Sequence, residues 1–105
     1  MKPVYEIRFD SHPRRVRVEF NGTWVADSRR VLVLQETRHA PVFYFPPEDV
    51  RFDLMEKTAL RTYCPFKGDA SYWTLKVGDK AAENAVWSYE DAMDDAEPIR
   101  RYLAY

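Results

Sequence analysis

The chain has 105 residues, of which 46% are hydrophobic and 31% charged, a composition typical of a globular protein and not of a disordered or membrane-spanning one. A net charge of −1 excludes a global positive field, so nucleic acid is not expected as a partner. The single cysteine excludes an internal disulfide, and Cys64 with only two histidines makes a poor set of zinc ligands, so neither a metal nor a cofactor is expected.

The first predicted feature is a hairpin. Apolar and charged residues alternate in Val16–Phe20, which predicts a strand with one buried face. Asn21-Gly22 supplies the positive φ angles of a tight turn, and residues 23–26 are predicted to be the returning strand. Asp27-Ser28 then reads as a turn whose side chains bond their own backbone.

A buried strand and an aromatic strand follow. Residues 31–34 form an apolar run that is too short for a helix and suits a central strand covered on both faces. Val42–Phe45 is predicted to be an aromatic strand, and residues 46–50 a short helical turn that begins at a proline pair. A two-residue period then predicts a strand over residues 51–56 that leads towards Cys64.

A second hairpin is predicted near the end of the chain. Residues 71–77 form its first strand, Gly78-Asp79 its turn, and residues 85–89 its second strand, with Trp87 and Tyr89 on one face. The acidic residues 90–97 are predicted to be loop. A short helix is expected after Pro98.

These elements predict one domain over residues 1–105 with a mainly β fold. Six or more short strands with little helix are typical of an antiparallel sandwich or a bent, barrel-like sheet, here with one or two short helical turns. The opening residues Met1–Glu6 lack the apolar stretch of a secretory signal, and no later segment is long enough to span a bilayer. We therefore expect a cytoplasmic protein with no membrane partner.

One stretch carries a family resemblance. Residues 62–73, Thr-Tyr-Cys-Pro-Phe-Lys-Gly-Asp-Ala-Ser-Tyr-Trp, are similar to the signature of a bacterial family known as domain of unknown function 427. Matching positions extend over residues 13–105 and include Asp27-Ser28, Leu34 with Glu36, and Asp49-Val50. The resemblance implies a compact, mostly β fold and no established reaction.

A nucleotidyltransferase-like label has been attached to that family, and the residues argue against it. Nucleotidyl transfer needs carboxylates on neighbouring strands to hold magnesium, and a Gly-rich turn for the phosphates. Lys67-Gly68 has the reverse order of a Walker lysine, and no glycine run precedes it. Asp94-Asp95 lies in a tail that reads as solvated.

The signature turn contains the first candidate site residues. Cys64 precedes a proline, which favours extended backbone, and Lys67 could approach its sulfur and favour the thiolate of a nucleophile. Alternatively, Cys64 is a small buried hydrophobe. Lys67 before Gly68 suits a cation held where the backbone bends close to an anionic ligand, whereas the alternative is an exposed turn lysine.

The remaining candidates come from predicted strands. Glu36 ends an apolar strand and is a candidate acid, base or partner for Lys67, while an ordinary strand-end carboxylate is the alternative. His39 is predicted to lie in a loop without a role. The aromatic candidates are expected either to line a ligand pocket or to fill the core, and strand alternation sends two of them to opposite faces. They are Tyr44, Tyr72, Trp73 and Trp87.

Two functions remain open, and the sequence does not decide whether the protein is an enzyme. The first is a small-molecule site, binding or catalytic, around the Cys64–Gly68 turn, with a small anionic ligand as the first candidate. The second is a non-catalytic module for protein interaction or self-association, such as a homodimer, through edge strands and surface aromatics. A third, nucleic-acid binding through Arg14, Arg15 and Arg17, is disfavoured by the near-neutral total charge.

Overall fold

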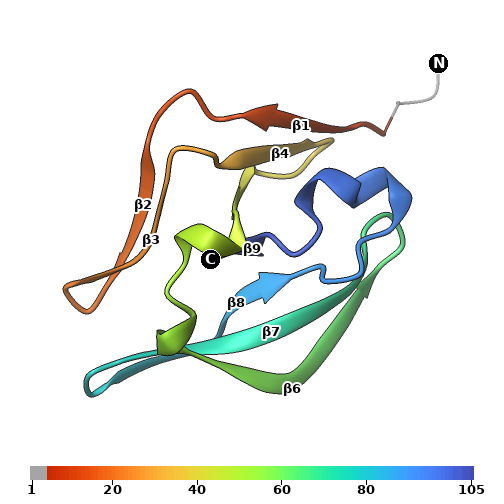
Figure 1. Cartoon of the computed structure of the whole chain (residues 1–105). Helices are drawn as coiled ribbons and strands as arrows, with labels where there is room; N and C mark the ends of the chain where they lie inside the picture. Colours follow the sequence, from red (N-terminus) through yellow and green to blue (C-terminus); the bar gives the residue numbers. More distant parts are fainter. Residues whose placement is uncertain (1–4) are drawn as a thin grey trace.

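Strands dominate the computed structural model, which describes residues 5–105 (Figure 1). Part of the stretch used to predict the lack of a secretory signal, residues 1–4, lies outside the described residues. The strands are β1 (Ile7–Ser11), β2 (Val16–Phe20), β3 (Thr23–Ser28), β4 (Leu32–Glu36), β5 (Val42–Phe45), β6 (Met55–Cys64), β7 (Gly68–Val77), β8 (Lys80–Ser88) and β9 (Leu103–Ala104). Three short 3₁₀ helices connect them: η1 (Pro47–Asp49), η2 (Phe52–Leu54) and η3 (Asp94–Ile99).

Seven strands form one antiparallel sheet in the order β1-β4-β5-β9-β8-β7-β6, and β2 and β3 pair separately. Figure 1 shows β1 and β4 across the molecule from β7 and β6, with β5 and β9 between the two pairs. The outer strands β1 and β6 do not pair with each other, so the sheet is bent and open. The mainly β, antiparallel fold predicted from the sequence is therefore confirmed, as a bent sheet that does not close into a barrel.

The first hairpin forms as predicted. Asn21 and Gly22 have φ angles of 48° and 76°, which the two central positions of a tight hairpin turn require. β3 continues two residues beyond the predicted end, because Asp27 and Ser28 pair with β2 instead of turning. Their side chains are held by partners elsewhere in the chain.

The apolar run of residues 31–34 contributes to β4, which lies second from one edge of the sheet and not at its centre. The outer neighbour is β1, which the sequence did not predict. Phe9 of β1 pairs with Leu34, and Ile7 and Phe9 pack against the buried cluster around Leu34 and Tyr44. Val33 and Leu34 point to opposite faces and are 8% and 2% exposed, so the strand is covered on both faces as predicted, although it is not central.

The predicted strand over residues 51–56 is wrong. Residues Phe52–Leu54 form η2, and the strand begins at Met55. The Arg51 amide donates to the Val25 carbonyl at 2.8 Å and the Leu54 amide to the Arg51 carbonyl at 3.1 Å, so the chain turns here. Because Phe52 is 45% exposed, the apparent two-residue period does not mark a buried face.

The helix expected after Pro98 is also wrong. The 3₁₀ helix η3 begins within the acidic stretch predicted to be loop, contains Pro98 and ends one residue after it, and the chain then forms β9. β9 fills the gap between β5 and β8, where Ala104 lies opposite both Tyr44 and Trp87. Ile99 and Leu103 are both buried, but they belong to different core clusters, so their helical spacing has no common face.

Alternation along the strands divides the core. One cluster contains Leu34, Tyr44, Tyr89 and Ile99, with Tyr72 and Trp87 packed against it. A second contains Val25, Trp73, Leu75, Val86 and Leu103. Neighbouring residues of β7 and β8 therefore serve opposite faces of the sheet. No helix in residues 5–105 has the length and apolar character needed to cross a bilayer.

Candidate functional site

The Cys64–Gly68 segment is the turn between β6 and β7. Cys64 pairs with Gly68 at the ends of these strands, and the Lys67 amide donates to the Cys64 carbonyl at 3.2 Å. Gly68 has a φ of +106°, in the region that favours glycine. The Met93 amide donates to the Lys67 carbonyl at 3.0 Å, which ties the turn to the segment after β8. In this tight turn, Lys67 is buried and not exposed.

Lys67 forms a buried ion pair with Glu36. Its Nζ lies 3.0 Å from Glu36 Oε1, and the two side chains are 9% and 10% exposed. Of the three roles expected for Glu36, partner of Lys67 is the one that the structure contains. The hydroxyl of Tyr5 donates to the other carboxylate oxygen, and the Tyr5 ring stacks on Phe66 with centroids 4.8 Å apart. The pair therefore links the β6–β7 turn to the end of β4.

Electrostatics keep the Lys67 amine charged. Burial acts to lower the pKa of Lys67, but the hydrogen bond to Glu36 and the proximity of Cys64, Glu36 and Tyr89 outweigh it and raise this pKa. The ammonium also lies 5.9 Å from the centre of the Tyr89 ring. An ammonium has three donors. Glu36 takes one, and no other hydrogen-bond partner among residues 5–105 contacts Nζ.

The ion pair contributes to the wall of a cavity of about 360 Å³, which we call the Lys67 pocket. This volume is at the small end of the range for small-molecule sites. The polar lining comes from Tyr5, Glu36, His39, Tyr44, Cys64, Lys67 and Tyr89. Apolar lining comes from Leu34, Val42, Pro65, Phe66 and Trp87. Five of the eight predicted site residues, Cys64, Glu36, Lys67, Tyr44 and Trp87, thus meet at one pocket.

Tyr44 and Trp87 serve both the core and the pocket. Tyr44 is 1% exposed and belongs to a buried cluster, against which Trp87 packs. Burial raises the pKa of Tyr44, and a hydrogen bond with Trp87 opposes this shift in part. The phenol of Tyr44 is therefore neutral at physiological pH, and its hydroxyl is held in place by the indole.

Three predicted site residues do not line the Lys67 pocket. Gly68 shapes the turn through its backbone. Tyr72 packs against the same core cluster as Tyr44, and its hydroxyl is hydrogen-bonded to Thr62 at 2.8 Å. Trp73 belongs to the opposite core cluster and lines a different cavity. Alternation along β7 places Tyr72 and Trp73 on opposite faces, as the sequence predicted.

The sequence predicted no site role for seven of the twelve residues that line the pocket, among them four with an aromatic or imidazole ring. Tyr89 could have been predicted to line the pocket, because its expected position shares a strand face with Trp87. Phe66 lies inside the signature, and His39 is exposed in the turn after β4, as expected for a loop residue. Nothing in the sequence indicates that Tyr5 lines the pocket, since its contacts with Glu36 and Phe66 depend on where β1 runs in the fold.

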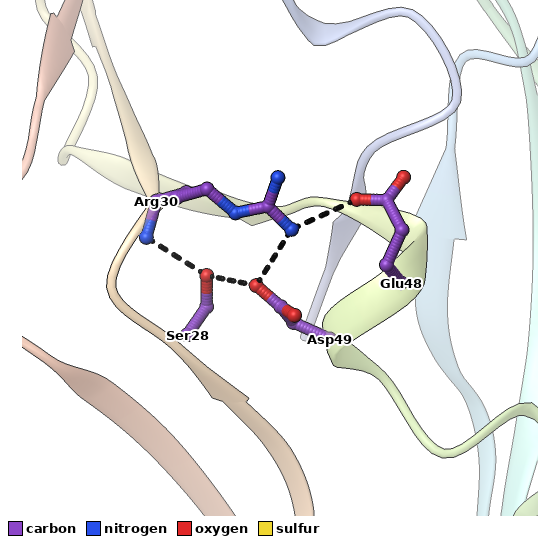
Figure 2. Close-up of polar contacts among 4 residues, drawn as sticks. All are labelled: Ser28, Arg30, Glu48 and Asp49. Carbon is purple, nitrogen blue, oxygen red and sulfur yellow. Dashed lines mark hydrogen bonds and ion pairs between the residues drawn. The ribbon is translucent and has the colours of Figure 1, made fainter.

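Other residues that match the family have structural roles. Figure 2 shows Ser28, at the end of β3, whose hydroxyl donates to Asp49 at 2.6 Å and accepts the Arg30 amide at 2.9 Å. The Arg30 guanidinium reaches Glu48 at 3.0 Å and Asp49 at 3.3 Å. Asp27 is paired with Arg15. Ser28 thus links the hairpin to η1, and Asp27 links the end of β3 to Arg15, the residue before β2.

The arginine cluster and the acidic groups have no ligand-like arrangement. Arg15 is paired with Asp27, and the Arg17 guanidinium lies 4.1 Å from the centre of the Trp24 ring. Within residues 5–105, no group of three or more His, Cys, Asp and Glu side chains is arranged to hold a metal ion.

Comparison with known proteins identifies the family. No curated protein matches the chain. The family model described as a domain of unknown function, DUF427, matches residues 8–105, which is nearly the whole chain and includes the Cys64–Gly68 turn and Glu36. The chain therefore belongs to the DUF427 family.

Proposed function

We propose that the chain binds a small, mostly apolar molecule with one carboxylate or carbonyl group in the Lys67 pocket. The observation that carries this proposal is the buried Lys67 ammonium, which keeps two hydrogens without a partner among residues 5–105. Unpaired buried donors are unfavourable. A ligand oxygen that accepts these hydrogens restores the lost hydrogen bonds and binds with a charge-assisted contact.

The charge of the pocket restricts the ligand. Glu36 neutralises Lys67, so the pair as a whole carries no net charge. A phosphate dianion would place its second charge near the Glu36 carboxylate, which is unfavourable. A single carboxylate or a carbonyl avoids that repulsion, and the side chains of Leu34, Val42 and Trp87 suit an apolar body.

In this binding site, each candidate residue that lines the Lys67 pocket has a defined place. Lys67 donates to the ligand, and Glu36 holds the ammonium in position. Tyr44 and Trp87 form the wall. Cys64 and Glu36 remain the candidates for a chemical step.

Cys64 offers a direct readout, because it is the only cysteine and it lines the Lys67 pocket. Small carboxylic acids and amides would be screened by thermal shift, and each compound that stabilises the protein would be tested for slowing the alkylation of Cys64 by iodoacetamide. We expect the stabilising compounds to protect the thiol. Stabilisation without protection would contradict binding in this pocket.

A double variant that removes both charges of the buried ion pair tests the role of Lys67. Lys67→Met/Glu36→Leu replaces the pair by two apolar side chains, and replacing a buried ion pair by apolar residues is often neutral for folding. The control is Lys76→Met/Glu56→Leu, which removes a surface pair whose side chains are 56% and 67% exposed. We expect the first variant to lose the thermal shift and the second to keep it. An equal shift in both variants would refute the role of Lys67.

Self-association is a second candidate function that one observation favours. The ten-residue strand β6 forms an outer edge of the seven-stranded sheet, and it exposes Tyr63 at 66% and Leu60 at 41%. We propose that this edge pairs with a second copy of the chain. Sedimentation velocity over a wide concentration range would then show a dimer that Tyr63→Lys weakens. A strictly monomeric wild type would rule it out.

A further inference from the structure

A larger cavity of about 660 Å³ lies apart from the Lys67 pocket and shares no lining residue with it. We call it the Trp73 cleft. Trp87 lines the Lys67 pocket and the next residue, Ser88, lines the Trp73 cleft, so the two cavities lie on opposite faces of β8. The apolar lining of the Trp73 cleft comes from Pro47, Phe52, Trp73 and Leu103. Phe52 is 45% exposed there, which leaves an aromatic surface open to a ligand.

Three cationic and two acidic side chains line the Trp73 cleft, so the cations exceed the acids by one. Lys57 is paired with Glu90 at 2.7 Å, and Asp91 lies 3.8 Å from Arg100, which is outside the cleft. Arg61 and Arg101 also line the cleft. Neither guanidinium has a hydrogen bond or an ion pair with any residue in the described range 5–105. Two unpaired guanidiniums beside an aromatic surface suit a multivalent oxyanion.

A buried hydroxyl provides an independent observation. Ser88 is 1% exposed, and its Oγ is the one buried side-chain N or O atom among residues 5–105 that has no hydrogen-bond partner. Such an atom is unfavourable in a folded protein and needs an explanation. Its residue lines the Trp73 cleft, where a ligand group would supply the missing partner.

Arg101 also has an unusual backbone. Its φ is +66°, in the left-handed region where glycine is favoured over every other residue. The arginine therefore occupies this position at a conformational cost. Replacing it by glycine relieves the backbone and removes the guanidinium in one step, so the stability should rise while binding weakens.

We infer that the Trp73 cleft binds an aromatic phosphate monoester, with the phosphate between Arg61 and Arg101 and the ring against Phe52. Guanidinium groups match phosphate oxygens in pairs, and the dianion suits two unpaired cations. The ligand class differs from that of the Lys67 pocket, where Glu36 opposes a dianion. This inference stands independently of the proposed function.

The probe is 1-naphthyl phosphate, measured by titration calorimetry against the wild-type protein. Its two fragments, 1-naphthol and inorganic phosphate, are titrated separately. We expect the whole probe to bind at least about tenfold more tightly than either fragment, since both the ring and the phosphate contribute. Binding should weaken as salt is added, because the phosphate contact is electrostatic.

Variants of the cleft residues test where the probe binds. Arg61→Gln and Arg101→Gly should each weaken the probe about tenfold, as loss of a charge-assisted contact implies. The matched control is Arg38→Gly, because Arg38 also has a left-handed φ, of +63°, and does not line the cleft. Both glycine variants should raise the melting temperature, but only Arg101→Gly should weaken binding. Ser88→Ala should likewise raise the melting temperature and weaken the probe.

Several results would overturn the inference. They are no heat of binding at millimolar probe, equal affinity for 1-naphthol, or equal weakening by Arg38→Gly and Arg101→Gly. Protection of Cys64 from alkylation by the probe would also overturn it, because that result would place the probe in the Lys67 pocket. Failure of these tests leaves the carboxylate screen at the Lys67 pocket unaffected.

Discussion

At the scale of single residues, Gly68 provides the backbone conformation of the β6–β7 turn. Its φ of +106° lies beyond the left-handed helical minimum. A Cβ at this position would lie 3.4 Å from Met93 Cγ and 3.5 Å from the Asp91 carbonyl oxygen. Both are ordinary van der Waals distances, so the positive φ, and not a lack of space, is what favours glycine at this position.

Substitution of Gly68 by alanine should destabilise the protein more than the same substitution at Gly22. Gly22 has a φ of +76°, and a Cβ added there would have no atom within 4 Å, so only backbone strain of about 1 kcal/mol is expected. Gly68→Ala places a side chain at a φ of +106°, further from the left-handed minimum, and should cost about 2–3 kcal/mol. Urea unfolding of both variants measures the difference. Equal losses would mean that the two φ angles tolerate a side chain equally well.

The residues of the Lys67 pocket were predictable to different degrees. Lys67 and Cys64 stand out in the sequence because their turn combines a thiol, a cation and a glycine. Tyr5 could not be predicted, since its contact with Glu36 spans 31 positions and depends on the pairing of β1 with β4. Strand alternation predicted that Tyr72 and Trp73 separate, but not that Trp73 lines a cavity of its own.

At the scale of elements, the contact between β3 and η1 depends on Ser28. The hydroxyl is buried and connects the Arg30 amide to the Asp49 carboxylate (Figure 2). Arg30 adds two ion pairs, but its side chain is 62% exposed, so we expect these pairs to contribute little. The buried hydrogen bond is therefore the main polar link between the hairpin and η1.

Ser28→Ala should lower the free energy of unfolding by about 2 kcal/mol, because it removes the buried hydroxyl that accepts from the part-buried Arg30 amide and donates to Asp49, whose carboxylate then keeps only its pair with the exposed Arg30 side chain. Ser11→Ala is the control, since Ser11 is exposed and should change stability by less than about 0.5 kcal/mol. Guanidinium unfolding would provide both values. A loss at Ser28 no larger than at Ser11 would mean that water replaces the hydroxyl.

Elements fixed by local chemistry were predicted, and those fixed by distant pairing were not. The Asn21-Gly22 turn and the alternation of Val16–Phe20 define the first hairpin without help from the rest of the chain. β9 is only two residues long and exists because a gap remains between β5 and β8. η2 forms where the chain passes from the hairpin to β6, and nothing in the local period of residues 50–54 signals that change of direction.

At the scale of the whole molecule, buried phenols are distributed through the core. Tyr44 and Tyr89 lie in one buried cluster, and Tyr105 packs against the other two. Burial raises the pKa of all three tyrosines, and Lys67 opposes the shift at Tyr89 in part. Each phenol therefore stays protonated in the folded chain at a pH where it ionises in the unfolded chain.

This arrangement makes the fold sensitive to alkali. Below about pH 10, folded and unfolded tyrosines are both protonated, so stability is at its full value. As the pH rises above that point, the unfolded chain releases phenol protons that the folded chain retains, and the free energy of unfolding falls by about 1.4 kcal/mol per pH unit for each retained proton. Lys67, whose pKa is also raised, loses its stabilising contribution in the same direction.

Tyr44→Phe should therefore reduce the stability near neutral pH, where it removes the hydrogen bond with Trp87, and should make the decline above about pH 10 less steep by about 1.4 kcal/mol per pH unit. The control is Tyr63→Phe at an exposed side chain of β6. Urea unfolding followed by circular dichroism between about pH 8 and pH 11 gives the slope. An unchanged slope in Tyr44→Phe would show that this phenol ionises in the folded chain, and that the core around the Lys67 pocket admits water.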